Sequence, residues 1–143
     1  MAVITRSAGA EWHGTGKDGK GALTTQSGVL SATPYAANTR FGDTKGTNPE
    51  ELIAAAHAGC FSMALAFALG RAGFTPTKIA TSAVVTIESA DAGFKITKSA
   101  LKLEASVPNI NQAQFKEIAE GAKAGCPVSK VLNAEITLDW QLV

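Results

Sequence analysis

The sequence predicts an α+β protein with largely antiparallel sheet, helices against one face and a central buried helix. Three observations lead to this class. The first third of the chain carries paired β segments, a long apolar helix follows from about residue 49 to 71, and two strands then precede two helices and a last strand. Because the strands cluster instead of alternating with helices, they favour antiparallel sheet with helices against one face.

Length and composition indicate one compact domain over residues 1–143. Hydrophobic residues make up 45% and charged residues 17%, and the formal net charge of +1 gives no reason to expect nucleic acid or an anionic membrane as a partner. The N-terminal residues lack the basic patch and apolar core of a secretory signal. The apolar run over 52–69 is too short and too rich in alanine for a membrane span, so we expect a cytoplasmic protein.

The first third predicts a β-hairpin followed by a third extended piece. Residues 8–14 and 21–27 read as strands, and Gly16-Lys17-Asp18-Gly19 between them is typical of a hairpin turn. Residues 28–31 and 34–40 suggest a further, irregular extended segment.

The central helix has clear start signals. Asn48 suits the N-cap, Pro49 the first helical position, and Glu50 and Glu51 the positive end of the helix dipole. From there to about Arg71 apolar residues cover most of the circumference, so the helix must be surrounded by protein. One sheet on one side would leave apolar surface exposed, and we therefore expect a homodimer.

Two strands follow the central helix. Residues 85–88 alternate between apolar and polar side chains, a turn is predicted at 91–93, and residues 94–107 form the second strand. The apolar parity shifts within that second strand, which predicts a β-bulge near Ser99 and Ala100.

The last part of the chain predicts two helices and a strand. Residues 111–123 form an amphipathic helix that ends at Gly125, and Cys126-Pro127 open a short helix through Leu132. Residues 136–142 alternate as a strand with one apolar face.

The two cysteines are the first candidates for chemistry, because paired thiols in a reducing compartment are seldom structural disulfides. Cys60 lies well inside the central helix, where the dipole does not help its thiolate, so a reactive Cys60 needs a nearby cation; an inert buried thiol is the alternative. His57 lies three residues earlier on the same face. It suggests a Cys–His pair or half of a metal site, but a packed core histidine is the simpler interpretation and is preferred.

Cys126 has a different setting. Its sulfur is predicted at a helix N-terminus, where N–H groups favour a thiolate, although a passive N-cap explains it equally well. On local electrostatics Cys126 is the more activated thiol, and the residues leave open which cysteine attacks. Arg40 taken alone is a surface arginine, and Glu50 is explained by the helix dipole.

Several strings in the chain resemble one family. The osmotically inducible protein C and organic hydroperoxide resistance family is the one that Thr47–Leu52, Ala58–Phe61 and Ala124–Ser129 resemble. Its osmotically inducible protein C branch in particular resembles residues 27–30, 38–41 and 130–142. The resemblance covers essentially the whole chain, with both cysteines in order. It implies a thiol-dependent peroxidase that forms an intertwined homodimer with sheets around two central helices.

The resemblance also implies roles for the cysteines. Cys60 attacks an organic hydroperoxide and becomes a sulfenic acid, which Cys126 converts to a disulfide. An external dithiol, a lipoyl dithiol in one branch of the family, then reduces the disulfide. No metal, flavin or nucleotide cofactor is expected. A non-catalytic thiol redox sensor or hydrophobic-ligand carrier, or a structural stress protein with buried cysteines, is the alternative.

The family further pairs the reactive thiolate with an arginine and a glutamate. Glu50, directly after Thr-Asn-Pro, matches the glutamate. Arg40 is the better match for the arginine, because the hydroperoxide resistance branch carries it in the first hairpin, where this chain has Lys17 and Lys20. We expect Arg40 to lower the pKa of Cys60 and to hold the peroxide oxygen, with Glu50 fixing its orientation.

Overall fold

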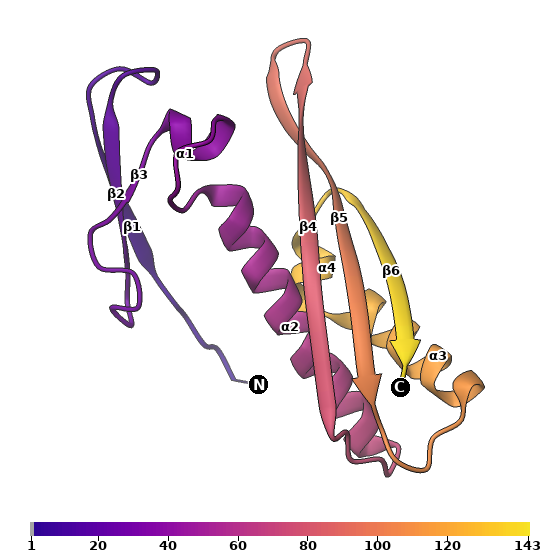
Figure 1. Cartoon of the computed structure of the whole chain (residues 1–143). Helices are drawn as coiled ribbons and strands as arrows, with labels where there is room; N and C mark the ends of the chain where they lie inside the picture. The colour runs from indigo at the N-terminus through magenta and orange to yellow at the C-terminus, as the bar shows by residue number, and fades with distance from the viewer. Residues whose placement is uncertain (1) are drawn as a thin grey trace. The chain divides into compact units, whose positions relative to one another are not determined.

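The structure, a computed structural model, describes residues 2–143 (Figure 1). The chain divides into two compact units, the first reaching Leu52 and the second running from Ile53 to Val143. Each unit is built on its own three-stranded sheet. The predicted α+β class is therefore confirmed, with three of the four strand pairings antiparallel.

The first unit begins with the predicted hairpin. Strand β1 (Ala8–His13) pairs antiparallel with β2 (Lys20–Thr25), and the short β3 (Thr33–Tyr35) pairs with β2 on its other side. Gly21 lies where the rings of Trp12 and Tyr35 meet edge to face, with their centroids 5.4 Å apart. A side-chain carbon at this position would come within 2.4 Å of the Tyr35 ring, so only glycine fits between the two aromatic residues.

The prediction of extended chain over 34–40 is wrong for its second half, which forms the short helix α1 (Ala37–Phe41). The Thr39 hydroxyl accepts a hydrogen bond from the N–H of Ala36 at 3.0 Å, which closes this turn. A single polar turn of this kind buries no apolar stripe, so its sequence carries no helical periodicity.

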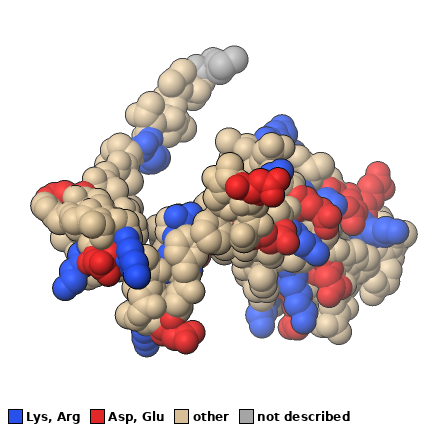
Figure 2. All heavy atoms as spheres, turned by 90° about the horizontal axis from the view of Figure 1, so that it is seen from above, with Lys and Arg blue, Asp and Glu red and all other residues tan. Residues whose placement is uncertain are grey.

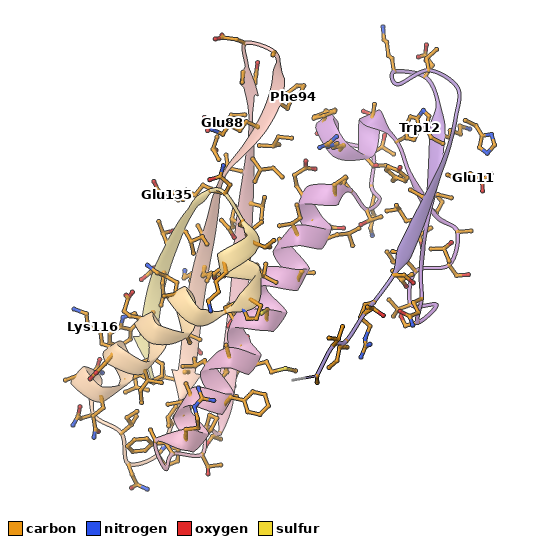
Figure 3. All side chains as sticks on the ribbon, turned by 180° about the vertical axis from the view of Figure 1, so that it is seen from behind. Glu11, Trp12, Glu88, Phe94, Lys116 and Glu135 are labelled. Carbon is orange, nitrogen blue, oxygen red and sulfur yellow. The ribbon has the colours of Figure 1, made fainter. Side chains whose placement is uncertain are left out.

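The second unit contains the larger sheet. Strands β4 (Lys78–Ala90) and β5 (Gly93–Ser106) form a long antiparallel hairpin, and β6 (Glu135–Leu142) pairs in parallel with β5. Figures 1 and 3, from opposite sides, show the helices gathered on one face of this sheet, with Phe94 and Glu88 at its hairpin end. The helices are α2 (Pro49–Arg71, which belongs to this unit from Ile53), α3 (Gln112–Gly125) and α4 (Pro127–Val131).

The predicted β-bulge is present, two residues before Ser99. Thr86 pairs with Lys98 and the next residue, Ile87, pairs with Ile96, so Thr97 is the extra residue on β5. After the bulge, alternate residues of β5 point into the core, as the shift in apolar parity required.

Helix α2 packs a single stripe of side chains into the core of the second unit. Its buried positions, His57, Phe61, Leu65 and Leu69, recur every four residues. The rest of the core comes from β5 and from the helices that follow it, with fully buried Leu101, Leu103, Ala105, Phe115, Ala119 and Cys126. Burial of each large apolar side chain contributes about 1.5–3 kcal/mol.

The predicted ends of α2 are confirmed. Asn48 Oδ1 accepts a hydrogen bond from the N–H of Glu51 at 2.8 Å, which caps the first turn. At the other end Gly73 has a φ of 90° and Phe74 donates to the carbonyl of Leu69 at 2.9 Å, the backbone pattern that ends a helix at a left-handed glycine.

Outside its buried stripe, α2 is more exposed than the sequence predicts. Met63 and Phe67 each expose 64% of their surface, so within this chain the helix is not buried on every side. By length and composition α2 would also suffice to cross a membrane, a criterion that core helices of soluble proteins meet as well.

Acidic and basic side chains are intermixed on the face of the molecule that Figure 2 shows. The same mixing appears in the ion pairs, such as that between Lys98 on β5 and Glu135 on β6, whose charged atoms are 3.8 Å apart. Neither sign gathers on that face into the broad single-sign surface that recognises nucleic acid or anionic lipid.

Candidate active site

The fold brings the two cysteines together. Cys60 lies on α2 and Cys126 is the N-cap residue of α4, and their side chains are within hydrogen-bonding reach of one another. Both are free thiols. Cys126 is fully buried, whereas Cys60 is partly exposed, so a molecule that reaches the pair from solvent meets Cys60 first.

The environment of this thiol pair makes its two members unequal. Burial raises the pKa of Cys60, and the hydrogen bond with Cys126 raises it further. Burial alone would also raise the pKa of Cys126, but the hydrogen bond from Cys60 and the interactions with Ser129 and Val128 outweigh it, and the pKa of Cys126 is lowered. Of the two thiols, Cys126 therefore ionises more readily, and its thiolate accepts a hydrogen bond from the Cys60 thiol.

The setting of Cys126 follows from its place at the start of α4. The sulfur makes no capping hydrogen bond of ordinary geometry. It nevertheless lies close enough to the N–H groups of Val128 and Ser129, and to the Ser129 hydroxyl, for them to stabilise negative charge on it. The Gly125-Cys126-Pro127 motif predicts a helix start that favours a thiolate, and the structure places Cys126 in such a position.

Arg40 and Glu50 form the second pair of predicted residues that the structure joins. Arg40 Nε donates to both carboxylate oxygens of Glu50 at 3.0 Å, and its NH2 nitrogen donates to Oε1 at 2.6 Å. Glu50 is buried, whereas Arg40 is exposed, with 36% of its side-chain surface accessible to solvent. A two-pronged contact of this kind fixes the plane of the guanidinium, which a single contact would leave free to rotate.

Local hydrogen bonds hold this ion pair in place. The Thr39 hydroxyl donates to the carbonyl of Thr47 at 2.9 Å, and the Asn48 side-chain amide donates to the carbonyl of Thr39 at 3.0 Å. These two bonds tie α1 to the residues just before α2. They place Arg40, from the last turn of α1, beside Glu50, from the first turn of α2.

The ion pair shifts the titration of both partners. Burial by itself raises the pKa of Glu50, but the hydrogen bond and charge of Arg40 outweigh it, so the pKa of that carboxyl is lowered. The hydrogen bond to Glu50 raises the pKa of Arg40. The guanidinium carbon also lies 5.0 Å from the centre of the Phe41 ring, a cation–π distance. The pair is therefore ionised throughout the neutral pH range.

A cavity of about 310 Å³ opens next to Arg40 in the first unit. Aromatic side chains supply much of its wall, and its lining includes Trp12, Tyr35, Phe41, Pro49 and Arg40. An apolar hollow with a single guanidinium at its edge suits a small molecule that has an organic body and one polar end.

The four predicted site residues thus form two contacting pairs, Arg40 with Glu50 in the first unit and Cys60 with Cys126 in the second. The competing cations, Lys17 and Lys20, are exposed in and beside the turn between β1 and β2.

His57 is a satisfied core histidine, as preferred, but two of its neighbours were not predicted. Its ring is fully buried, with Nδ1 2.6 Å from the hydroxyl of Ser99 and Nε2 2.8 Å from the hydroxyl of Ser129. Ser99 comes from β5, and Ser129 follows Cys126 by three residues on α4. The only sequence signal for Ser129 is this spacing, at which an N-cap residue and the third helical residue meet.

Comparison with known proteins places these features in a wider group. Residues 42–141 match the model of a family described as OsmC-like protein. The chain is 60% identical over 140 residues to peroxiredoxin OsmC of Escherichia coli, covering 98% of both proteins. It is 27% identical over 123 residues to organic hydroperoxide resistance protein OhrB of Bacillus subtilis, covering 85% of this chain and 88% of that protein.

The same relative provides a solved structure. The crystal structure of OhrB of Bacillus subtilis superposes with a TM-score of 0.69 at 26% identity, covering 94% of this chain and 98% of that chain. The similarity therefore extends to the fold over nearly the full length of both proteins.

Proposed function

Since the chain belongs to the OsmC-like family of cysteine-based peroxidases, we propose that it reduces organic hydroperoxides to alcohols with Cys60 and Cys126. The observation that carries the proposal is the contact between these two reduced thiols, which come from distant parts of the sequence. The Bacillus subtilis relative is an organic hydroperoxide resistance protein by name, which supports an organic hydroperoxide as the substrate class. The aromatic cavity beside Arg40 supports it as well.

The proposed cycle has three steps. The Cys60 thiolate attacks the terminal oxygen of R–O–O–H, the O–O bond breaks, and the alkoxide leaves and takes up a proton to give the alcohol. Cys60 is now a sulfenic acid. The Cys126 thiolate attacks its sulfur, the S–S bond forms, and hydroxide leaves and is protonated to water. An external dithiol, for which we propose a lipoyl protein, reduces the disulfide by thiol exchange.

The first step requires a cation beside Cys60. In this chain the hydrogen bond between the thiols leaves the shared proton on Cys60. A guanidinium next to Cys60 would reverse this preference by favouring the charged form of that sulfur. Arg40, oriented by Glu50 and ionised at neutral pH, is the residue that we propose for this role and for stabilising charge on the departing oxygen.

We further propose that the active site is completed in a homodimer, with Arg40 and Glu50 of one chain serving Cys60 of the other. Helix α2 is unbroken from Pro49 to Arg71. Ten residues along it separate Glu50 from Cys60 by about 15 Å of rise and about 80° of rotation. Glu50 therefore does not reach Cys60 on its own helix, whereas an antiparallel partner helix would bring it close.

The exposed apolar side of α2, including Met63 and Phe67, supports this dimer. In it the two units of each chain would work as one peroxidase domain. Because the proposed cycle depends on reduced thiols, we also propose a cytoplasmic location.

Two cysteine variants test the function. Cys60→Ser should abolish turnover of an alkyl hydroperoxide with a dithiol, whereas Cys126→Ser should still complete the first step and accumulate a sulfenic acid that a dimedone probe labels. Labelling of Cys60→Ser instead would assign the attack to Cys126. Oxidation by one equivalent of peroxide, without turnover in the presence of several dithiols, would indicate a thiol sensor and contradict the peroxidase.

A further inference from the structure

A buried hydrogen-bond network leads from β5 through α2 to Cys126. In it the Ser99 hydroxyl lies 2.6 Å from His57 Nδ1, and the Ser129 hydroxyl lies 2.8 Å from His57 Nε2. Ser99 and His57 are fully buried and Ser129 is 9% exposed. Ser129 is the third residue of α4 and Cys126 is its N-cap, a spacing that brings the serine hydroxyl close to the sulfur, and this hydroxyl helps to lower the pKa of the Cys126 thiol. The proposed cycle assigns His57 no part, although its ring is one serine away from a reacting thiol.

The number of protons in this network decides which group donates and which accepts in each hydrogen bond. Burial lowers the pKa of His57, so the ring is neutral and carries one proton. If that proton is on Nε2, the ring donates to Ser129, and the Ser129 proton points at Cys126. If it is on Nδ1, Ser129 must donate to Nε2 and has no proton left for the sulfur. Negative charge on Cys126 selects the first arrangement, with the Ser99 hydroxyl donating to Nδ1.

We propose that His57 is a positioning residue for Cys126: its Nε2–H donates to Ser129 and thereby commits the Ser129 hydroxyl proton to the Cys126 sulfur. Ser99 completes the network by holding Nδ1 as the acceptor. The inference rests on the proposed function for its place in the cycle, which is the step in which Cys126 attacks the Cys60 sulfenic acid. A stabilised Cys126 thiolate is present in a larger fraction of molecules at that moment.

The test measures the titration of Cys126 directly and uses no peroxide. In Cys60→Ser protein, Cys126 is the remaining thiol, and its thiolate absorbance near 240 nm is followed against pH. The groups that act on this sulfur are Cys60, which the variant replaces, and Ser129 and Val128 at the start of α4. Behind Ser129 lies the titratable ring of His57 from α2, and behind that ring the Ser99 hydroxyl from β5, which does not titrate.

Ser129→Ala should raise the measured pKa of Cys126 by about 1, because a hydrogen bond to a charged sulfur is lost. His57→Phe should raise it in the same direction. The double variant should raise it no further than Ser129→Ala alone, since His57 acts only through Ser129. Ser129→Thr, which keeps the hydroxyl, should restore the original pKa.

The matched control is Ser62→Ala, which removes another hydrogen bond between α2 and the sheet, that from Ser62 to Thr81 at 2.7 Å, and should leave the pKa of Cys126 unchanged. Should His57→Phe fail to fold, Ser99→Ala tests the same link and should also raise the pKa. An unchanged pKa in folded Ser129→Ala or Ser99→Ala protein, or additive effects in the double variant, would overturn the proposal. Absence of peroxide turnover by the unsubstituted protein, with these pKa shifts intact, would instead contradict the proposed function alone.

Discussion

At the scale of single residues, the guanidinium of Arg40 is held by three contacts to Glu50 and cannot turn away from the direction they impose. We expect Arg40→Ala to raise the pKa of the Cys60 thiol and to slow its reaction with an organic hydroperoxide about tenfold or more. The pH dependence of the rate of sulfenic acid formation measures both effects.

Lys17→Ala and Lys20→Ala are the controls for that experiment, because these lysines are the competing candidates in the first hairpin. Both should keep the original pH profile. A profile that shifts in a lysine variant and not in Arg40→Ala would transfer the role to the hairpin.

Buried His57 makes the stability of the protein depend on pH. Its folded pKa is lowered from 6.5 by burial, so below pH 6.5 the unfolded chain takes up a proton that the folded chain does not. The free energy of unfolding should therefore keep its highest value above pH 6.5 and decline as the pH falls towards the folded pKa of His57. Urea unfolding at several pH values measures this decline.

His57→Asn should flatten that decline, whatever its stability at neutral pH. His13→Asn is the matched control, because His13 is the other histidine of the chain and lies exposed on β1; a decline that flattens in His57→Asn alone is caused by His57. An equally steep decline in His57→Asn would show that other groups cause it.

The residues that could be predicted from sequence are those with local signals. Asn48, Pro49 and Cys126 are residue types or neighbours of residue types that favour helix starts, and the structure places all three at helix starts. The contacts of Ser99 and Ser129 with His57 carry no such signal, because they join residues far apart in the chain. A serine at position 99 or 129 therefore gives no indication in the sequence that it contacts His57.

At the scale of elements, the start of α2 carries more than a helix cap. Asn48 accepts from Glu51 and also donates to Thr39, so it links α2 to the segment that holds Arg40. Asn48→Ala should lower the free energy of unfolding by about 1 kcal/mol for the lost cap, with a further loss for the link to Thr39. It should also reduce peroxidase activity, because the position of Arg40 depends on the same side chain.

Asn111→Ala is the matched control, since Asn111 caps α3 in the same way, accepting from Gln114 at 2.8 Å. It should cost a similar free energy for the cap and leave the activity per folded molecule unchanged. Thermal unfolding together with initial turnover rates separates the two effects. Equal losses of activity in both variants would mean that stability alone matters.

Elements with a strong periodic pattern could be predicted almost to the residue, as β6 and α3 show. Helix α1 could not, because five residues without a buried side chain have no apolar face to repeat. The β5 bulge was expected in kind but misplaced by two residues. The alternation of apolar residues shows that the strand changes register somewhere between Ile96 and Leu101. Which residue is the extra one depends on the backbone hydrogen bonds to β4, which the sequence does not reveal.

At the scale of the whole molecule, the apolar circumference of α2 exceeds what one chain covers. We expect a stable dimer by analytical ultracentrifugation. We also expect Glu50→Ala and Cys60→Ser proteins, each impaired alone, to regain up to one working site when refolded together as mixed dimers. The Cys60→Ser chain then supplies Glu50, and the Glu50→Ala chain supplies both cysteines.

The control mixes Arg40→Ala with Glu50→Ala, which damage the same half-site. Here each chain keeps its cysteines but lacks a working partner pair, so the mixed dimer should show no recovery. If the first mixture also fails to recover, Glu50 serves the cysteine of its own chain or lies outside the site.

The parallel pairing of β6 with β5 has a consequence for the newly made protein. Cys60 is synthesised with α2, but Cys126 follows only after β4, β5 and α3, and β6, which closes the sheet beside β5, comes later still. Contacts between such distant segments form late in folding. For that interval the nascent chain carries Cys60 as a thiol without Cys126, the residue that we propose to resolve its sulfenic acid. A peroxidase that meets its substrate before β6 has docked is therefore exposed to over-oxidation by the compound it will later remove.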